Sequence, residues 1–569
     1  MRDLIRLVVP VLLVLSMSMP LTGQVSQAEI EDAIDRGVQV ILGMQAEDGR
    51  WPYAPGGNEQ VARQVGHTAL AVLALQHARS KRTEAHLAIK KGLSFMLQHE
   101  PEPLTYTAGL VEQCLYWDSP RQHQKMITCY GWMLCGGQKL DGAQKGSWTY
   151  GLPRPPQNWV QSGLRHLGTP SAGRSDNSNS QFGILGLVYA EKAGFQVPKA
   201  VWERARDYYI GSQHKDGGWD YMSEAYRLVA PERDRTPRRP TMAMTLAGTV
   251  SSYLCEEALA DKRHRQCKAP APNECHEKGL EWIADHWRPT QGAYGWYACE
   301  RLGILIGYSE FGGHDWFQEG AADLRGAIGS VHGWQGPMVN TAFAVLFLAR
   351  GRHPIIINKL KREGDWNLHR YDLKNLIEHI SGPWQHPSQW RIITLDASVD
   401  MLLRVPILWI SGHEALNLNG EEKGKLKEYV ERGGTILGEA CCGRTSFDLS
   451  FRELLKELWP DTELRALPKT HAIYTSFRKL TQKPTLMGLP LDAGQGRLGV
   501  IYIPHGMSCK WEVAGPRSQP WLDVGACIYL YVDQVNRRMG VRPRAVQEQE
   551  AKPGGRVDGF GEEFGRTGR

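Results

Sequence analysis

The sequence lacks an excess of charge of one sign. Its 67 Lys and Arg residues are offset by 61 Asp and Glu residues, so 569 residues carry a formal net charge of only +6. A nucleic-acid-binding protein is expected to concentrate basic residues in a patch or stripe, often beside aromatic residues, and the sequence has no such stripe. We therefore predict that the protein has no nucleic-acid partner.

Long apolar runs are lacking beyond the N-terminus. Two arginines precede an uncharged run at residues 7–19, which is the layout of a secretory signal peptide. The run is shorter than the roughly 20 apolar residues that span a bilayer. We expect residues 1–28 to be removed by a cut after Ala28, with a cut after Gly23 or an uncleaved anchor as alternatives. The mature chain would be exported, to a periplasm or outside the cell, with no membrane span.

Metal-binding motifs are lacking as well. The eleven cysteines are an odd number, so in an oxidising compartment at least one thiol stays free or pairs between chains. One polar stretch holds three cysteines and two histidines: Cys255, His264, Cys267, Cys275 and His276. A loop disulfide is favoured there over a zinc site. We predict no metal ion and no cofactor.

An internal repeat is what the first half contains instead. The string Gln-x-x-Asp-Gly-x-Trp occurs at residues 45–51 and 213–219, and a stretched copy runs from Gln138 through Asp141-Gly142 to Trp148. Residues 291–296 and 333–334 resemble degenerate copies. Apolar helical patterns follow the repeats, and about twelve helices in six pairs are expected from residue 29 to residue 350. Such hairpins, with apolar inner members, close into a ring.

These repeats resemble the QW-type (prenyltransferase and squalene oxidase) repeats of the terpene cyclases and protein prenyltransferases. The resemblance covers residues 29–355 and implies an all-α (α/α)6 toroid like that of squalene cyclases. It implies a central cavity in which a lipid or isoprenoid, or else a protein, could bind. It does not imply an activity, because the repeat is structural and the same ring serves noncatalytic proteins.

The chemical motifs of that superfamily are incomplete. Squalene-type cyclases protonate their substrate with a DxDD motif, and the best match here is Asp176-Asn177-Ser178-Asn179, which keeps the first carboxylate only. Asp176 is therefore the candidate acid, and capping of the following helix is the alternative role. The Asp-x-Cys zinc motif of prenyltransferases and the thioester sequence of complement-type toroids are both missing.

Polar and aromatic residues near the degenerate repeats are the candidate ligand-binding residues of the ring, namely Trp296, Tyr297, Glu300 and Asp315. They could face a ligand or pack between hairpins, with Glu300 and Arg301 forming an ion pair. An arginine cluster before residue 242 could meet an anion or lie in a solvated loop with interleaved acids; its members are Arg227, Arg233, Arg235, Arg238 and Arg239.

The pattern changes after residue 350. We expect a linker at residues 356–365 and an α/β domain at 366–540, in which apolar strands alternate with amphipathic helices. This alternation is typical of a mostly parallel, flavodoxin-like sheet covered on both faces. The polar, glycine-rich tail at residues 541–569 is expected to be disordered.

Cys441 follows a predicted strand of this domain, and Cys441-Cys442-Gly443 resembles the nucleophile turn of class I glutamine amidotransferases. The whole stretch is similar to an uncharacterised bacterial family, domain of unknown function 4159, which is often joined to toroids. The resemblance implies Cys441 as nucleophile, with His471 or His505 as base. The first glycine of the enzyme motif and its His-x-Glu pair are absent.

The sequence thus favours an exported two-domain binding or scaffold protein, in which a fold is kept and its catalytic groups are lost. An isoprenoid enzyme that uses Asp176 as its acid is the first alternative. A hydrolase or amidotransferase that uses the Cys441 thiol is the second.

Overall fold

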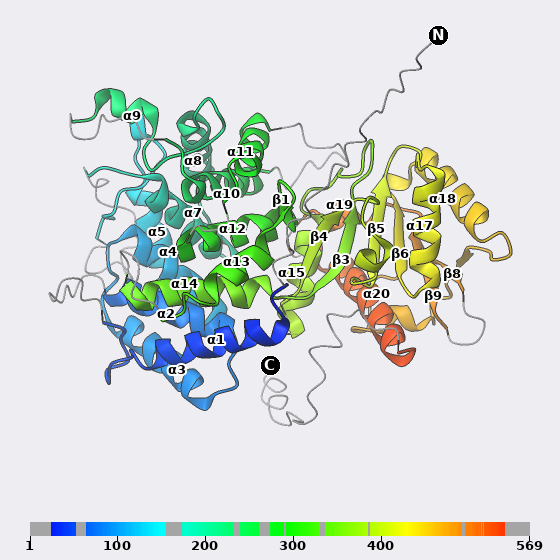
Figure 1. Ribbon diagram of the computed structural model, residues 1–569, viewed down its shortest axis with the longest axis horizontal. Helices are drawn as coiled ribbons and strands as arrows, with labels where there is room; N and C mark the ends of the chain where they lie inside the picture. Colours follow the sequence, from blue (N-terminus) through cyan, green and yellow to red (C-terminus); the bar gives the residue numbers. More distant parts are fainter. Residues whose placement is uncertain are drawn as a thin grey trace, which may run out of the picture.

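The computed structural model describes residues 24–52, 64–154, 173–231, 239–260, 273–288, 292–329, 336–384, 387–491, 496–513, 515 and 517–540. Two bodies lie side by side, a helical one that precedes residue 352 and one built around a sheet (Figure 1). The predicted leader, up to residue 23, and the predicted tail lie outside the described residues. No helix of the described ranges is long and apolar enough to cross a membrane.

The helical character of the first body is confirmed. Six helices of the described ranges are buried on most sides and touch one another in a closed ring, in the order α2 (Gln64–Ala78), α4 (Thr105–Asp118), α7 (Asn177–Lys192), α10 (Met242–Leu259), α12 (Gly292–Ile306) and α14 (Gly336–Gly351). Six more lie outside them: α1 (Gln27–Leu42), α3 (Thr83–Gln98), α5 (Gln124–Gly137), α8 (Lys199–Ser212), α11 (Glu274–Asp285) and α13 (Trp316–Leu324). The short α9 (Glu224–Val229), η3 (Gly142–Gln144) and the hairpin β1 (Glu310–Phe311) and β2 (His314–Asp315) lie in the connections.

The repeat fastens neighbouring outer helices to one another. Each repeat tryptophan donates its indole N–H to the outer helix before it: Trp51 to Ile41, Trp148 to Leu134 and Trp219 to Tyr209. Each repeat glutamine donates to a turn glycine and to the backbone of the next outer helix: Gln45 to Gly49 and Ala88, Gln138 to Gly146 and Val201, Gln213 to Gly217 and Cys275. The motif therefore stabilises the ring.

The glycine of the stretched repeat is Gly146, not Gly142 as the spacing suggested. Gly146 has φ +93°, and a Cβ there would lie 2.0 Å from the carbonyl oxygen of Arg204. Gly49 and Gly217 have the same conformation and the same kind of contact. Gly142 instead begins η3 and has open space around it. The invariant part of the repeat is thus Gly-x-Trp, and the insertion precedes it.

The second body is a mixed sheet of seven strands in the order β4 (Gln389–Ile393), β3 (Ile355–Leu360), β5 (Ile407–Gly412), β6 (Thr435–Ala440), β9 (Leu498–Ile503), β8 (Met487–Pro490) and β7 (Arg465–Ala466) among the described residues. The first five are parallel, whereas β8 pairs antiparallel with β9 and β7 pairs antiparallel with β8. One face packs on α15 (Asp372–Trp384), α19 (Ser508–Trp511) and α20 (Gln519–Arg538). The other packs on α16 (Val399–Leu402), α17 (Gly420–Glu431) and α18 (Thr445–Leu458).

The first half of the linker expected at residues 356–365 belongs to strand β3. β3 lies between β4 and β5 in the sheet, although its sequence carries a lysine and follows Pro354. Lys359 is buried because its ammonium group donates to the carbonyl oxygen of His369 and to Asp372, at 2.6 and 2.8 Å. A buried charge that is paired in this way is tolerated in a central strand.

The two bodies meet where several inner helices end. Backbone and side-chain hydrogen bonds join Ile392 to Gly307 and Gln389 to Arg350. Three ion pairs join α15, or the loop just before it, to the ends of α7 and α10: Lys192 with Glu378 at 2.8 Å, Arg370 with Glu256 at 2.9 Å, and Lys374 with Glu257 at 2.5 Å. The sheet domain therefore covers that end of the ring (Figure 1).

Candidate functional site

Two cysteines and two histidines lie close together at the carboxyl edge of the sheet. Because β3, β5, β6 and β9 are parallel, their C-terminal ends lie at one edge, where ligands bind in sheets of this kind. His413 follows β5, and Cys441 and Cys442 follow β6 on the turn η5 (Cys441–Gly443). The loop after β3 adds His369.

Cys441 and His369 form a thiol–imidazole pair. Nε2 of His369 lies 3.3 Å from Sγ of Cys441, and both side chains are buried. Lys359 holds the His369 backbone by its carbonyl oxygen, so the loop and strand β3 position this imidazole together. The pair has the arrangement that nucleophilic thiols use, but the thiol is 0% exposed.

Cys442 occupies a tight turn beside it. Its φ of 56° lies in the left-handed region, which is uncommon for a residue with a side chain, and its side chain is exposed. A Cβ at Gly506, in the loop after β9, would lie 2.5 Å from the Cys442 backbone nitrogen. Glycine is therefore required there for the two loops to approach.

His413 completes a cluster with both cysteines. One of its ring nitrogens and the two sulfur atoms lie within 4.8 Å of one another. Its Nε2 is buried and has no hydrogen-bond partner within the described ranges. Burial lowers the pKa of His413 and Asp365 opposes this effect. These three residues, with His369 beside them, could hold a metal ion.

Two carboxylates fix the loops around the cluster. Asp365 accepts a hydrogen bond from the backbone nitrogen of His413 at 2.5 Å and pairs with Arg362 at 3.0 Å. Glu439, in the position of the missing first glycine, is buried and accepts from Ser508 N at 2.7 Å and from Ser411 Oγ at 2.9 Å. Burial raises the pKa of Glu439. Both groups serve the loops rather than facing a ligand.

In the ring, Asp176 caps α7. Its carboxylate accepts a hydrogen bond from the Asn179 backbone nitrogen at 2.7 Å, which is the geometry of an N-cap. The side chain is buried, and burial raises its pKa. Ser178 next to it bonds the hydroxyl groups of Tyr106 and Tyr294 at 2.6 and 2.8 Å.

Aromatic side chains from four inner helices pack across the middle of the ring. Phe182 of α7 lies 4.7 Å from Tyr106 of α4 and 6.4 Å from Tyr297 of α12, between ring centroids. Phe343 of α14 lies 4.9 Å from Tyr297 and 5.7 Å from Tyr294. We call Tyr106, Phe182, Tyr294, Tyr297 and Phe343 the aromatic plug.

The four candidate ligand-binding residues of the ring do not converge. Trp296 lies inside α12 rather than in a repeat turn, is buried, and donates to Asp323 at 2.6 Å. Tyr297 belongs to the aromatic plug. Glu300 is buried and pairs with Arg350 at 3.2 Å, not with its neighbour Arg301. Asp315 caps α13 by accepting from Phe317 N and Gln318 N.

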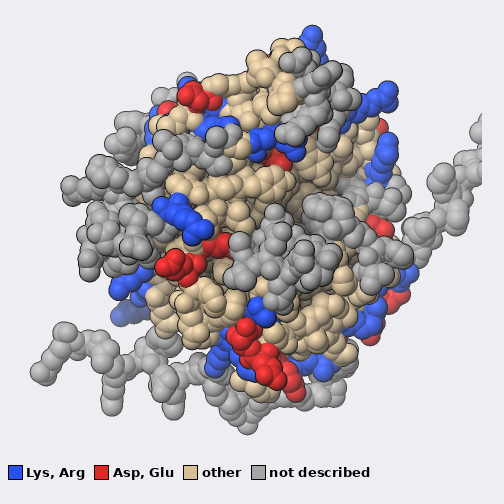
Figure 2. Space-filling model, turned by 90° about the vertical axis from the view of Figure 1, so that its left-hand side faces the viewer, with Lys and Arg blue, Asp and Glu red and all other residues tan. Residues whose placement is uncertain are grey.

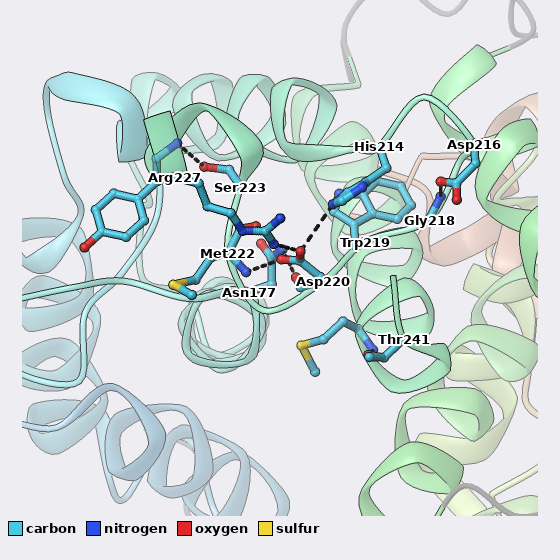
Figure 3. A network of polar contacts seen from close by, with 12 residues as sticks. Asn177, His214, Asp216, Gly218, Trp219, Asp220, Met222, Ser223, Arg227 and Thr241 are labelled. Carbon is cyan, nitrogen blue, oxygen red and sulfur yellow. Dashed lines mark hydrogen bonds and ion pairs between the residues drawn. The ribbon is translucent and has the colours of Figure 1, made fainter. Parts of the chain in front are cut away.

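A buried ion-pair network supports the start of α7 (Figure 3). Arg227 and His214 both approach the Asp220 carboxylate, and Asn177 donates to the Asp220 carbonyl oxygen at 2.6 Å. Arg227 is thus paired internally, whereas Arg233, Arg235 and Arg238 of the predicted cluster lie outside the described residues. On the end of the ring away from the sheet, Lys and Arg side chains are interspersed with Asp and Glu (Figure 2).

Two of the three cysteines of the predicted loop disulfide are described, and they do not form a disulfide with each other. Cys255 of α10 and Cys275 of α11 are buried free thiols, and His276 bonds Ser252 at 3.0 Å. Cys267 and His264 lie outside the described residues. Two of the three cysteines therefore lie in helices and not in one loop.

Sequence reasoning identified Cys441 but not the histidines that accompany it. His471 caps the short helix η6 (Ala472–Tyr474) by accepting from Ile473 N, and its ring packs on Tyr531 of α20. His505 lies at the carboxyl edge, near Gly443. His413 could have been found, since it follows a predicted strand; no sequence signal indicated His369.

Comparisons with solved structures find similarities at low identity. An inactive variant of the α-1,6-mannanase GH76A of Salegentibacter sp. HEL1_6, in complex with α-1,6-mannotriose, aligns with a TM-score of 0.40 and 9% identity over 56% of this chain and 98% of that chain. The type II terpene cyclase MstE from Scytonema aligns with a TM-score of 0.33 and 12% identity over 57% of this chain and 99% of that chain.

No match was found among curated proteins. A protein-family model does match the second body, and it covers β3 as well as the strands that follow. Residues 356–541 match the family described as domain of unknown function (DUF4159).

Proposed function

We propose that the protein is an exported binding or scaffold protein, in which a terpene-cyclase-like (α/α)6 toroid is fixed to an amidotransferase-like domain. In this proposal the outer surfaces of the two domains bind a partner macromolecule. The ring supplies a rigid frame and carries out no reaction.

The aromatic plug is the observation that carries this proposal. An isoprenoid cyclase must enclose its substrate, whereas here side chains from α4, α7, α12 and α14 meet in the middle of the ring. Tyr297 and Phe182 are 0% exposed. Close-packed aromatic rings leave no room for a polyprenyl chain unless several of them move together.

Helix α1 favours one of the two expected cleavage sites. Ser26 caps this helix by accepting from Glu29 N, and Glu29 bonds back to Ser26 N at 2.9 Å. Val25 is buried and its backbone nitrogen donates to Gln318. A cut after Ala28 would remove this capping box, whereas a cut after Gly23 would keep it.

Native mass spectrometry of the protein isolated from its exported compartment tests the proposal. We expect a chain that starts at Gln24, carries no isoprenoid and associates with a second protein. Solvent extraction of the same sample should release no polyprenyl or triterpene species. A stoichiometric isoprenoid would contradict the scaffold function and support the enzyme alternative.

The capping role of Asp176 and its role as an acid in the enzyme alternative predict different results. If this residue only caps α7, Asp176→Asn should leave the melting temperature nearly unchanged, because Asn is an equally good cap, and Asp176→Ala should cost about 1 kcal/mol. Asp141→Ala is the matched control, since exposed Asp141 makes no capping hydrogen bond. Loss of isoprenoid turnover in Asp176→Asn, at an unchanged melting temperature, would instead identify Asp176 as the acid.

The Cys441 thiol gives a second candidate function, as the nucleophile of a hydrolase or amidotransferase. The short distance to His369 favours it, because an imidazole at this distance can take the thiol proton. The burial of Cys441 counts against it, since a substrate must reach the sulfur atom. We therefore rank this function second to the scaffold function.

A further inference from the structure

The cysteines and histidines at the carboxyl edge of the sheet are not needed for a scaffold function, and their side chains are of the types that bind metal ions. Its ligand atoms come from separate parts of the chain: His413 follows β5, the two cysteines follow β6, and His369 follows β3. A histidine nitrogen and two sulfurs already lie within 4.8 Å of one another. Nε2 of His413 is buried without a partner in the described ranges, which is costly unless something binds there.

We propose that His413, Cys441 and Cys442 bind one zinc-type divalent ion, and that His369, which contacts Cys441 but lies outside the group within 4.8 Å, turns inward to become the fourth ligand. Two thiolates and two imidazoles are a common ligand set of tetrahedral zinc. In such a site a bound sulfur and a bound nitrogen lie about 3.6 Å apart, given bonds of about 2.3 and 2.0 Å at tetrahedral angles. The 3.3 Å between Cys441 Sγ and His369 Nε2 is close to that value.

The surrounding contacts hold the ligands in place. Asp365 bonds the backbone of His413, and Lys359 bonds the backbone of His369. Gly506 packs against the backbone of Cys442, which keeps the strained turn closed. Partners of this kind orient metal ligands and raise affinity. Cys442 is exposed and His413 half-buried, so an ion can enter from solvent before it reaches buried Cys441.

Binding has a defined proton balance. Two thiol groups become two thiolates, the ion forms two bonds to sulfur and two to nitrogen, and two protons pass to the buffer. No electron is transferred. The cysteines must be reduced, so a thiol-free reductant belongs in every measurement.

Cobalt and zinc titrations of the reduced full-length protein test the site. We expect one Co²⁺ per chain, with the absorption of tetrahedral thiolate-bound cobalt, and displacement by Zn²⁺. Cys442→Ser and His413→Gln should each weaken binding by at least about 100-fold, the upper end of losses seen when even an outer partner is removed. Cys135→Ser and His471→Gln are the controls and should bind as the wild type does. No thiolate absorption, or equal affinity in all five proteins, would overturn the proposal.

Alkylation of the wild-type protein keeps the test independent of folding in the variants. Zn²⁺ should slow the labelling of Cys442 by iodoacetamide at least about 10-fold, because a bound thiolate is shielded, and should leave Cys135 unaffected. Labelling of Cys441 at a rate that Zn²⁺ does not change would overturn the metal site and support the nucleophile. A scaffold function would survive that result, so the two proposals fail separately.

Discussion

Replacing Trp219 with alanine should destabilise the protein by about 3–5 kcal/mol, the range for a fully buried tryptophan. Trp219 is 0% exposed and donates its indole N–H to the carbonyl oxygen of Tyr209. It packs on two glycines: Cβ atoms at Gly248 and Gly279 would lie 2.5 and 3.1 Å from its ring. Truncation would leave a cavity between α8, α10 and α11, and it would remove one of the two side-chain hydrogen bonds that the Tyr209 carbonyl oxygen accepts, leaving the bond from Ser212 Oγ.

The measurement is chemical unfolding followed by circular dichroism. Trp117→Ala is the matched control, because Trp117 is 42% exposed and its removal should cost less than about 1 kcal/mol. If both variants unfolded at the same denaturant concentration, the repeat tryptophans would not be what joins the outer helices.

Replacing Asp220 with alanine should cost a similar amount, about 3–5 kcal/mol, for an electrostatic reason. Asp220 and Arg227 are 1% and 7% exposed, and they form an ion pair. Removal of the carboxylate would leave the Arg227 guanidinium group, which also donates to the Met222 carbonyl oxygen, buried without this counterion. Breaking a buried pair on one side is costly because the remaining charge has lost both water and partner.

A double variant separates charge from packing. Asp220→Leu combined with Arg227→Met should recover part of the lost stability, since no charge then stays buried. Asp207→Ala, at an exposed ion pair with Arg206, should change stability by less than about 1 kcal/mol. Equal losses in the single and double variants would show that shape, not charge, decides the stability of this turn.

The repeats made the helical half predictable because the residues of each motif lie close together in the sequence and recur. Gln, Gly and Trp of one turn contact the helix before it and the next outer helix, so the pattern is visible in the sequence. The stretched copy was aligned on the wrong glycine, since Gly142 follows an aspartate whereas Gly146 is set by its distance to Trp148. Strand β3 was missed because a lysine argues for a loop unless its partner, here Asp372, is known.

The candidate sites were less predictable because long-range contacts create them. Cys441 could be identified from the strand before it, whereas His369 is 72 residues away and reaches it only through a loop after β3. In the ring, Trp296 and Asp315 are of residue types that often bind ligands, yet each forms a hydrogen bond with a residue of α13. The aromatic plug joins four helices that no sequence window contains together.

The sheet domain covers the end of the ring where four inner helices end, and this makes the junction between the domains sensitive to salt. Helices α7, α10, α12 and α14 all direct their C-terminal ends toward the sheet domain, and aligned peptide dipoles leave partial negative charge at such ends. Arg370 and Lys374 are the cations placed there by the partner domain. Dissolved salt screens attractions of this kind more than it affects apolar cores. The strength of the junction between the domains therefore depends on ionic strength, whereas the apolar contacts within each core depend on it little.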